Sequence, residues 1–140
     1  MPYATAQDIV DRLPNGQEGL LLLADRDGDG VADEAVVSGA LGDAADEIDS
    51  YLAAVYTLPL PSVPPVLVRL SVDIAIYRMA ADAARATEEH RVRYEDAVKL
   101  LQSISRRTAA LPLPDGVEPP AAHIATFSAG PRLFKRGGLP

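Results

Sequence analysis

The sequence predicts an all-α protein, a small bundle of four to five helices followed by an extended arm rich in proline and glycine. Apolar residues recur every three or four positions over long stretches, which is the spacing of one face of a helix. Hydrophobic residues make up 48% of the 140-residue chain and aromatic residues only 5%, so the core must be aliphatic. We therefore expect one helical domain over residues 1–111 and an arm over residues 112–140.

Two short helices are expected first. Thr5 and Asp8 have the spacing of a capping box, so the first helix should begin directly after Thr5. The turn Asn15-Gly16 ends it, and residues 18–24, with four consecutive leucines, predict a helix of about two turns. An acidic loop follows, and Asp33 stands where it could cap the next helix.

Three long helices are expected after the loop, over residues 34–56, from 66 to about 86, and from 88 to about 109. The connector 57–65 contains four prolines, which cannot continue a helix, although the last two suit the first turn of the helix that follows. Thr87 should cap the last helix. The side chains expected to face inward are Leu41, Ile48, Leu52, Leu67, Leu70, Ile74, Val92, Ala97, Val98, Leu101 and Ile104.

Charge is distributed unevenly along the chain. Residues 1–60 carry twelve acidic and two basic side chains, a net charge of −10, whereas residues 61–111 carry +2 and residues 112–140 carry +1. A protein that binds duplex DNA needs a concentrated basic face, which this distribution does not provide. The asymmetry fits head-to-tail contact between copies of the chain, and it equally fits two ordinary solvated faces.

The residues offer little for catalysis, so we expect a protein that is not an enzyme. The absence of cysteine excludes disulfides, thiolate metal sites and cysteine nucleophiles. The two histidines, His90 and His123, have no carboxylate or nucleophile at a useful spacing. Asp73 lies on an otherwise apolar helix, where a buried ion pair or a contact between subunits is favoured over a catalytic acid.

Neither a signal peptide nor a membrane span is expected. The N-terminus has no basic region followed by an apolar run. No apolar stretch approaches the length needed to cross a bilayer.

The acidic loop over residues 25–36 carries the strongest chemical signal. Its pattern matches the start of an EF-hand calcium loop, with Gly30 at the position of the sixth-residue glycine. Val36 stands where a bidentate glutamate should close the cage, so the loop is incomplete. A turn that only caps the next helix remains the alternative. The candidate calcium ligands are the carboxylates of Asp25, Asp27, Asp29 and Asp33 and the backbone carbonyl of Val31.

The chain as a whole resembles the head–tail connector, or neck adaptor, family of Mu-like phages and prophages, long classed as a domain of unknown function. The resemblance extends over nearly the full length and rests on the order and spacing of several short motifs. Val55 departs from the basic residue that usually precedes the Tyr-Thr-Leu-Pro-Leu motif. The motifs are Pro2-Tyr3-Ala4-Thr5, Asp25-Arg26-Asp27-Gly28-Asp29-Gly30, Glu47-Ile48-Asp49-Ser50-Tyr51-Leu52, Tyr56-Thr57-Leu58-Pro59-Leu60, Asp73-Ile74-Ala75-Ile76-Tyr77-Arg78 and Arg93-Tyr94-Glu95-Asp96-Ala97.

The resemblance implies a small helical adaptor in the neck of the virion, assembled in the host cytoplasm. Copies would form a ring, twelve-fold in the family, beneath the portal protein, extending the DNA channel and carrying a stopper or tail-completion protein. Such adaptors perform no covalent chemistry, and genome DNA passes through them without sequence-specific binding. The alternative from the residues alone is a calcium-binding helical module of a bacterial protein complex.

The C-terminal arm contains spaced apolar anchors and a basic cluster. Both phenylalanines of the chain lie in it, which a merely solubilising tail would not need. We therefore expect a docking arm that orders on the portal or on a neighbouring subunit, for example by strand addition. A disordered end with incidental aromatic residues is the alternative. The expected docking residues are Ile124, Phe127, Arg132, Leu133, Phe134, Lys135 and Arg136.

Overall fold

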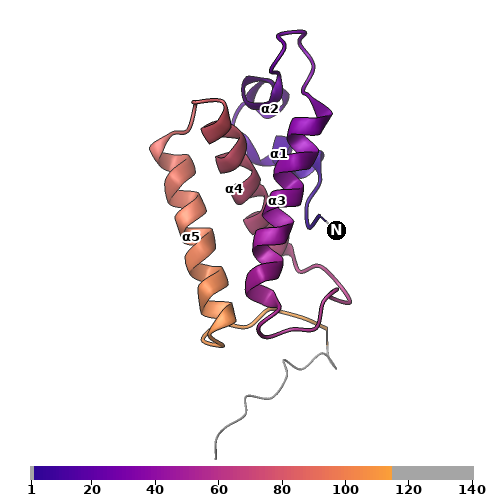
Figure 1. The fold of residues 1–140 in the computed structure, drawn as a ribbon, viewed down its shortest axis with the longest axis vertical. Helices are drawn as coiled ribbons and strands as arrows, with labels where there is room; N and C mark the ends of the chain where they lie inside the picture. Colours follow the sequence, from indigo (N-terminus) through magenta and orange to yellow (C-terminus); the bar gives the residue numbers. More distant parts are fainter. Residues whose placement is uncertain (1, 115–140) are drawn as a thin grey trace, which may run out of the picture.

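The computed structural model describes residues 2–114, which form five helices and contain no strand (Figure 1). This confirms the predicted all-α class. The helices are α1 (Ala6–Arg12), α2 (Gly16–Ala24), α3 (Glu34–Leu52), α4 (Pro65–Asp82) and α5 (Glu88–Ser105).

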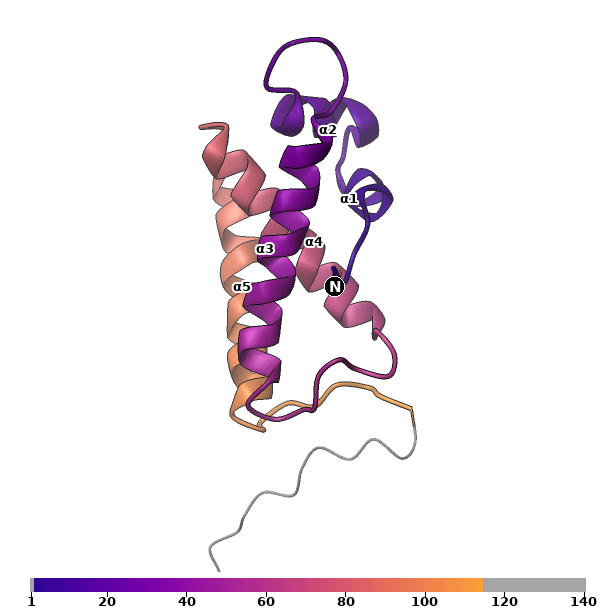
Figure 2. The same ribbon diagram turned by 45° about the vertical axis from the view of Figure 1, so that its right-hand side comes forward.

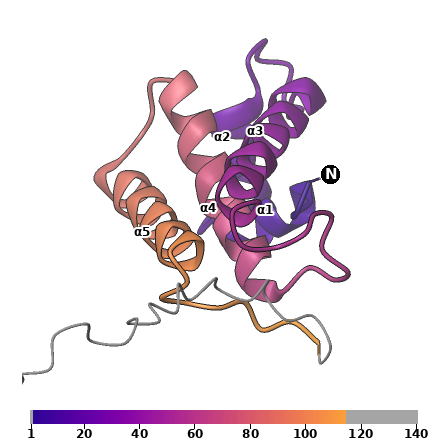
Figure 3. The ribbon, with the colours of Figure 1, turned by 60° about the horizontal axis from the view of Figure 1, so that its bottom comes forward.

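Helices α3, α4 and α5 form the body, and the short helices α1 and α2 cover one side of it (Figures 1 and 2). Helix α4 contacts each of the other four helices. The view from below shows it between α5 on one side and α1 and α3 on the other (Figure 3). Ten residues of α4 are buried, against seven of α3 and three of α5, because a helix surrounded by others has little surface left for water.

The predicted helix starts are confirmed where they depend on local capping. In α1 the Thr5 hydroxyl accepts a bond of 3.3 Å from the backbone N–H of Asp8, and the Asp8 carboxylate accepts one of 2.7 Å from that of Thr5. Pro64 and Pro65 open α4, with Pro65 in the first turn, where a missing N–H costs nothing. Thr87 caps α5 as predicted.

Two helix ends lie earlier than the sequence indicated, because each closes in a Schellman motif formed by a residue other than glycine. Helix α4 was expected to reach about residue 86, but Ala84 adopts a left-handed φ of 55° and Arg85 N–H bonds back to Ala80 O at 2.7 Å. Helix α5 was expected to reach about residue 109, but Arg107 has a φ of 61° and Thr108 N–H bonds to Ser103 O at 2.9 Å.

Helix α3 also ends early, at Leu52 instead of Tyr56. The carbonyl of Leu52 accepts bonds from both Val55 N–H, at 2.9 Å, and Tyr56 N–H, at 2.8 Å, so the chain turns out of the helix there. Tyr56 is nevertheless buried, and its hydroxyl accepts a bond of 3.1 Å from Leu111 N–H. The segment after α5 is held against the base of the bundle in this way, and Leu111 and Leu113 both pack against the core.

The aliphatic core is confirmed. Ala97 and the eight leucines and isoleucines expected in the core are all buried in one cluster. Val92 was expected to face inward, and this was wrong, because it is 42% exposed. At about 100° per residue, Val92 is about 140° around α5 from Ala97 and so projects toward solvent. Val98 is only half-buried.

Candidate functional site

The acidic loop joins α2 to α3 and extends beyond the end of the bundle (Figure 1). It is closed at its base by a bond of 2.9 Å from Asp33 N–H to Ala24 O. Gly28 and Gly30 have φ values of 78° and 83°, a left-handed conformation that glycine adopts without strain. The alternation of aspartate and glycine in the sequence therefore produces a tight, outward-facing loop.

The aspartates of the loop fold back onto its own backbone. The two carboxylate oxygens of Asp25 accept bonds from Gly28 N–H at 2.8 Å and Gly30 N–H at 2.9 Å. Asp27 accepts from Asp29 N–H at 3.1 Å, and Asp29 accepts from Val31 N–H at 2.8 Å. These Asx turns are the local hydrogen bonds that the turn-and-cap alternative requires.

The same folding brings three of the predicted ligands together. Carboxylate oxygens of Asp25, Asp27 and Asp29 all lie within 4.8 Å of one another. The fourth carboxylate, Asp33, is not in this group. It stands at the start of α3 but makes no side-chain capping bond there, because it accepts instead from Arg26 N–H at 2.8 Å. Asp33 is therefore the N-cap residue of α3, as predicted, but without a side-chain capping bond.

The surroundings of Asp25 and Asp27 shift the pKa values of these two carboxyls in opposite directions. The bonds from Gly30 N–H and Gly28 N–H hold the pKa of Asp25 below its usual range. The bond from Asp29 N–H lowers the pKa of Asp27, but desolvation, a side-chain bond with Asp25 and repulsion from Asp29 and Asp33 together raise it. Negative charge concentrated on three oxygen donors suits a hard cation such as Ca²⁺, which takes oxygen ligands. Val31 can offer only its backbone carbonyl oxygen. Val36 stands where the bidentate glutamate should be, so no carboxylate closes the cage.

Asp73 on α4 is buried, with 8% of its surface exposed, and pairs with Arg12 of α1. The Arg12 Nε lies 3.5 Å from Asp73 Oδ1, and that oxygen has no hydrogen-bond partner among the described residues. Burial raises the pKa of the Asp73 carboxyl, although Arg12, Arg93 and Arg69 act against this. The ion pair joins the short helix α1 to α4, as the sequence favoured, but it does not offset the cost of burying the charged carboxylate.

Sequence reasoning missed a polar hub that links the three long helices. Glu47 of α3 accepts a bond of 2.7 Å from the Arg78 guanidinium of α4 and one of 2.8 Å from the Tyr94 hydroxyl of α5. The Tyr94 ring stacks on Tyr77 with the ring centroids 4.5 Å apart. Desolvation and the bond to Glu47 raise the pKa of Tyr94 to about 12. The hub fixes the register of α3, α4 and α5, and no spacing within one helix could have shown it.

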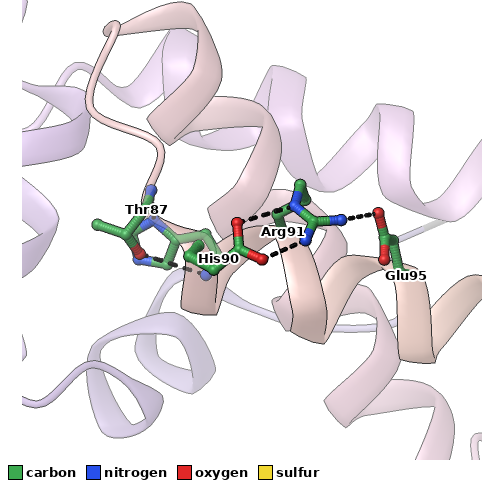
Figure 4. A network of polar contacts seen from close by, with 5 residues as sticks. Thr87, His90, Arg91 and Glu95 are labelled. Carbon is green, nitrogen blue, oxygen red and sulfur yellow. Dashed lines mark hydrogen bonds and ion pairs between the residues drawn. The ribbon is translucent and has the colours of Figure 1, made fainter.

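The start of α5 carries a second polar network (Figure 4). His90 Nδ1 accepts a bond of 3.2 Å from Thr87 N–H and so completes a capping box. Arg91 pairs with Glu88 and Glu95 on the same face of the helix. His90 therefore has a local structural role as part of the cap, which the sequence did not predict.

The remaining predicted site residues, Ile124 to Arg136 of the arm, lie outside the described residues. Among residues 2–114, no helix is both long enough and apolar enough to cross a membrane.

Comparison with known proteins identifies the family. Residues 3–129 match the family described as Bacteriophage Mu, Gp36. The chain is 34% identical over 121 residues to gene product J of Escherichia phage Mu. The matched region covers 80% of this chain and 84% of that protein. It is 43% identical over 86 residues to the Mu-like prophage FluMu protein gp36 of Haemophilus influenzae, covering 61% of this chain and 60% of that protein. The chain thus belongs to the Gp36 family of Mu-like phages and prophages.

Proposed function

We propose that this protein is a head–tail connector of a Mu-like phage or prophage. The observation that supports this most is the family match over residues 3–129, which agrees with the resemblance described from the sequence motifs. In this role copies of the chain form a ring, twelve-fold as in the family, beneath the portal protein. The ring extends the DNA channel and carries the stopper or tail-completion protein in the neck of the virion, after assembly in the host cytoplasm.

The chemistry of the described residues supports a structural role over a catalytic one. Asp25, Asp27 and Asp29 accept backbone bonds within their loop. Glu47 accepts from Arg78 and Tyr94, and Asp73 pairs with Arg12. These partners support a structural role for the carboxylates, and the connector role as proposed involves no covalent chemistry and requires no cofactor.

The charge distribution supports a channel that does not hold DNA. The first 60 residues carry a net charge of −10, and a wall of this sign repels phosphates. Genome DNA would then pass along the ring without sticking and without sequence-specific contact. A basic lining would instead bind the backbone and release counterions, which would slow ejection.

An in vitro joining assay tests this role. Phage or induced prophage lacking the gene should yield filled heads and separate tails, and adding the purified full-length chain should convert them into complete particles. The inactive control is an equal amount of the Ile74→Ala variant of this chain. Both proteins are assayed at one temperature, above the melting temperature of the variant and below that of the wild type. The proposal fails if heads and tails join without the protein, or if its loss leaves heads empty.

A second candidate function rests on the loop alone. The three carboxylates within 4.8 Å fit a calcium-binding helical module of a larger protein complex, in which the ion would stiffen the α2–α3 connection. The two candidates are distinguished by calcium dependence, since the connector role as proposed does not require the ion.

A further inference from the structure

An open apolar groove of about 390 Å³ lies between α1, α2 and the start of α3. Its apolar floor includes Val10, Leu20, Val37 and Leu41. Exposed polar residues line its edges, among them Gln7 and Ser38. A groove of this size can take two or three apolar side chains of an extended peptide.

Apolar surface continues beyond the groove at the same end of the molecule. Leu22 on α2 is 54% exposed, and Val31, which lines the groove, is 64% exposed. They are two of the four large apolar side chains that residues 2–114 expose. Exposed apolar residues beside a groove are typical of an interaction site.

The surroundings of the groove are strongly acidic. Residues 6–41, which form its walls and the adjoining loop, carry eight acidic and two basic side chains, a net charge of −6. The matching partner is therefore a peptide that combines apolar anchors with positive charge. This combination occurs once in the chain, in residues 121–140, which have Ile124, Phe127, Leu133 and Phe134 as anchors, three basic side chains and no acidic one.

We propose that the groove between α1, α2 and α3 binds the C-terminal segment 121–140 of a second copy of this chain. The inference concerns two copies of the protein and stands without the proposed place in the virion. Phe127 and Phe134 supply the apolar contact, and Arg132, Lys135 and Arg136 face the acidic loop and its neighbours.

The uneven charge of the chain favours a second copy as the partner. Residues 1–60 carry a net charge of −10 and residues 61–140 one of +3, which suits contact between the acidic half of one copy and the basic end of the next. The groove extends along α3 as far as Leu41, about 16 Å along the helix axis from its end at Leu52. Residues 115–123 span at most about 32 Å when fully extended, so the segment can also reach the groove of its own chain, and the mixing experiment below distinguishes the two cases.

A contact of this kind is heterologous, because the two partners use different surfaces. Each copy keeps one groove and one C-terminal segment available for further neighbours. Such contacts form a ring when the rotation between copies closes. The inference therefore gives the chain an intrinsic means of head-to-tail assembly.

A complementation experiment with full-length variants tests the inference. Gln7→Arg with Ser38→Arg fills the groove edge with bulk and positive charge at two exposed positions. Phe127→Ala with Phe134→Ala removes the aromatic anchors of the segment. Sedimentation velocity should show wild-type assemblies larger than a dimer that grow with concentration, whereas each variant alone should remain monomeric.

Mixing the two variants supplies one intact groove and one intact segment. The mixture should therefore form a dimer and nothing larger, since the remaining groove and segment are both blocked. Matched controls are Ser50→Arg, the same change on an exposed position of α3 about 18 Å away, and Thr126→Ala with Ser128→Ala in the segment. Both should assemble as wild type does, and all variants should keep the wild-type melting temperature.

Three results would overturn the inference. One is a wild-type chain that stays monomeric at the highest concentration at which it remains soluble. Another is a groove or segment variant that assembles as well as wild type. The third is a mixture that remains monomeric, which would place the segment in its own groove or on a different protein.

Discussion

Ile74 lies at the centre of the bundle, and its truncation to alanine measures how much the shared core stabilises the fold. The side chain is fully buried on α4, the helix that contacts all four others. Ile74→Ala removes three carbon atoms and leaves a cavity that tightly packed neighbours cannot fill. Truncations of this kind cost about 2–5 kcal/mol, and for Ile74 we expect a cost near the middle of that range, about 3–4 kcal/mol.

This cost is large for a body of this size. At about 4 °C for each kcal/mol, the melting temperature should fall by about 12–16 °C. Urea unfolding followed by circular dichroism gives the free energy, with the slope against denaturant unchanged if only stability has changed. Val92→Ala is the matched control, because Val92 is 42% exposed and its truncation should change stability by less than about 0.5 kcal/mol. A loss below 1 kcal/mol for Ile74→Ala would refute the core described here.

Three further predictions concern the loop, the buried carboxyl and the arm. Millimolar calcium should raise the melting temperature if the loop holds the ion, and Asp27→Ala or Asp29→Ala should each abolish the rise; a wild type that does not respond leaves the loop as a turn. Asp73→Asn should be more stable than wild type at pH 7, because burial raises the pKa of this carboxyl in the folded state and ionisation therefore costs stability. The gain should disappear as pH falls below the ordinary value of 3.8, where Asp73 is protonated in both states, and equal melting temperatures at pH 7 would count against it. Deletion of residues 121–140 should leave the melting temperature nearly unchanged but weaken attachment to phage heads, and a truncated protein that joins heads as well as the full chain would disprove the docking arm.

Local signals made the helix starts predictable and left two of the helix ends hidden. The capping box of Thr5 and Asp8 and the cap at Thr87 depend on residues three positions apart, so the sequence shows them directly. The ends of α4 and α5 depend on left-handed residues that are usually glycine. Here they are Ala84 and Arg107, and nothing in the sequence marks them.

One candidate site could be predicted from local sequence, and the other two could not. The aspartates of the loop lie within a few residues of one another, so their convergence follows from spacing alone. The hub of Glu47, Arg78 and Tyr94 joins three helices across 31 and 47 positions of sequence. The groove likewise combines two short helices, a loop and part of α3, and it exists only once they pack together.

The head–tail connector role is tested most directly by locating the protein in the particle. Cryo-electron microscopy of the neck, with symmetry assigned from the images, should show a ring directly beneath the portal vertex. Each unit of that ring should fit the five-helix body, with α3, α4 and α5 as three adjacent rods. Density for the body elsewhere in the virion, or a neck built without it, would contradict the account.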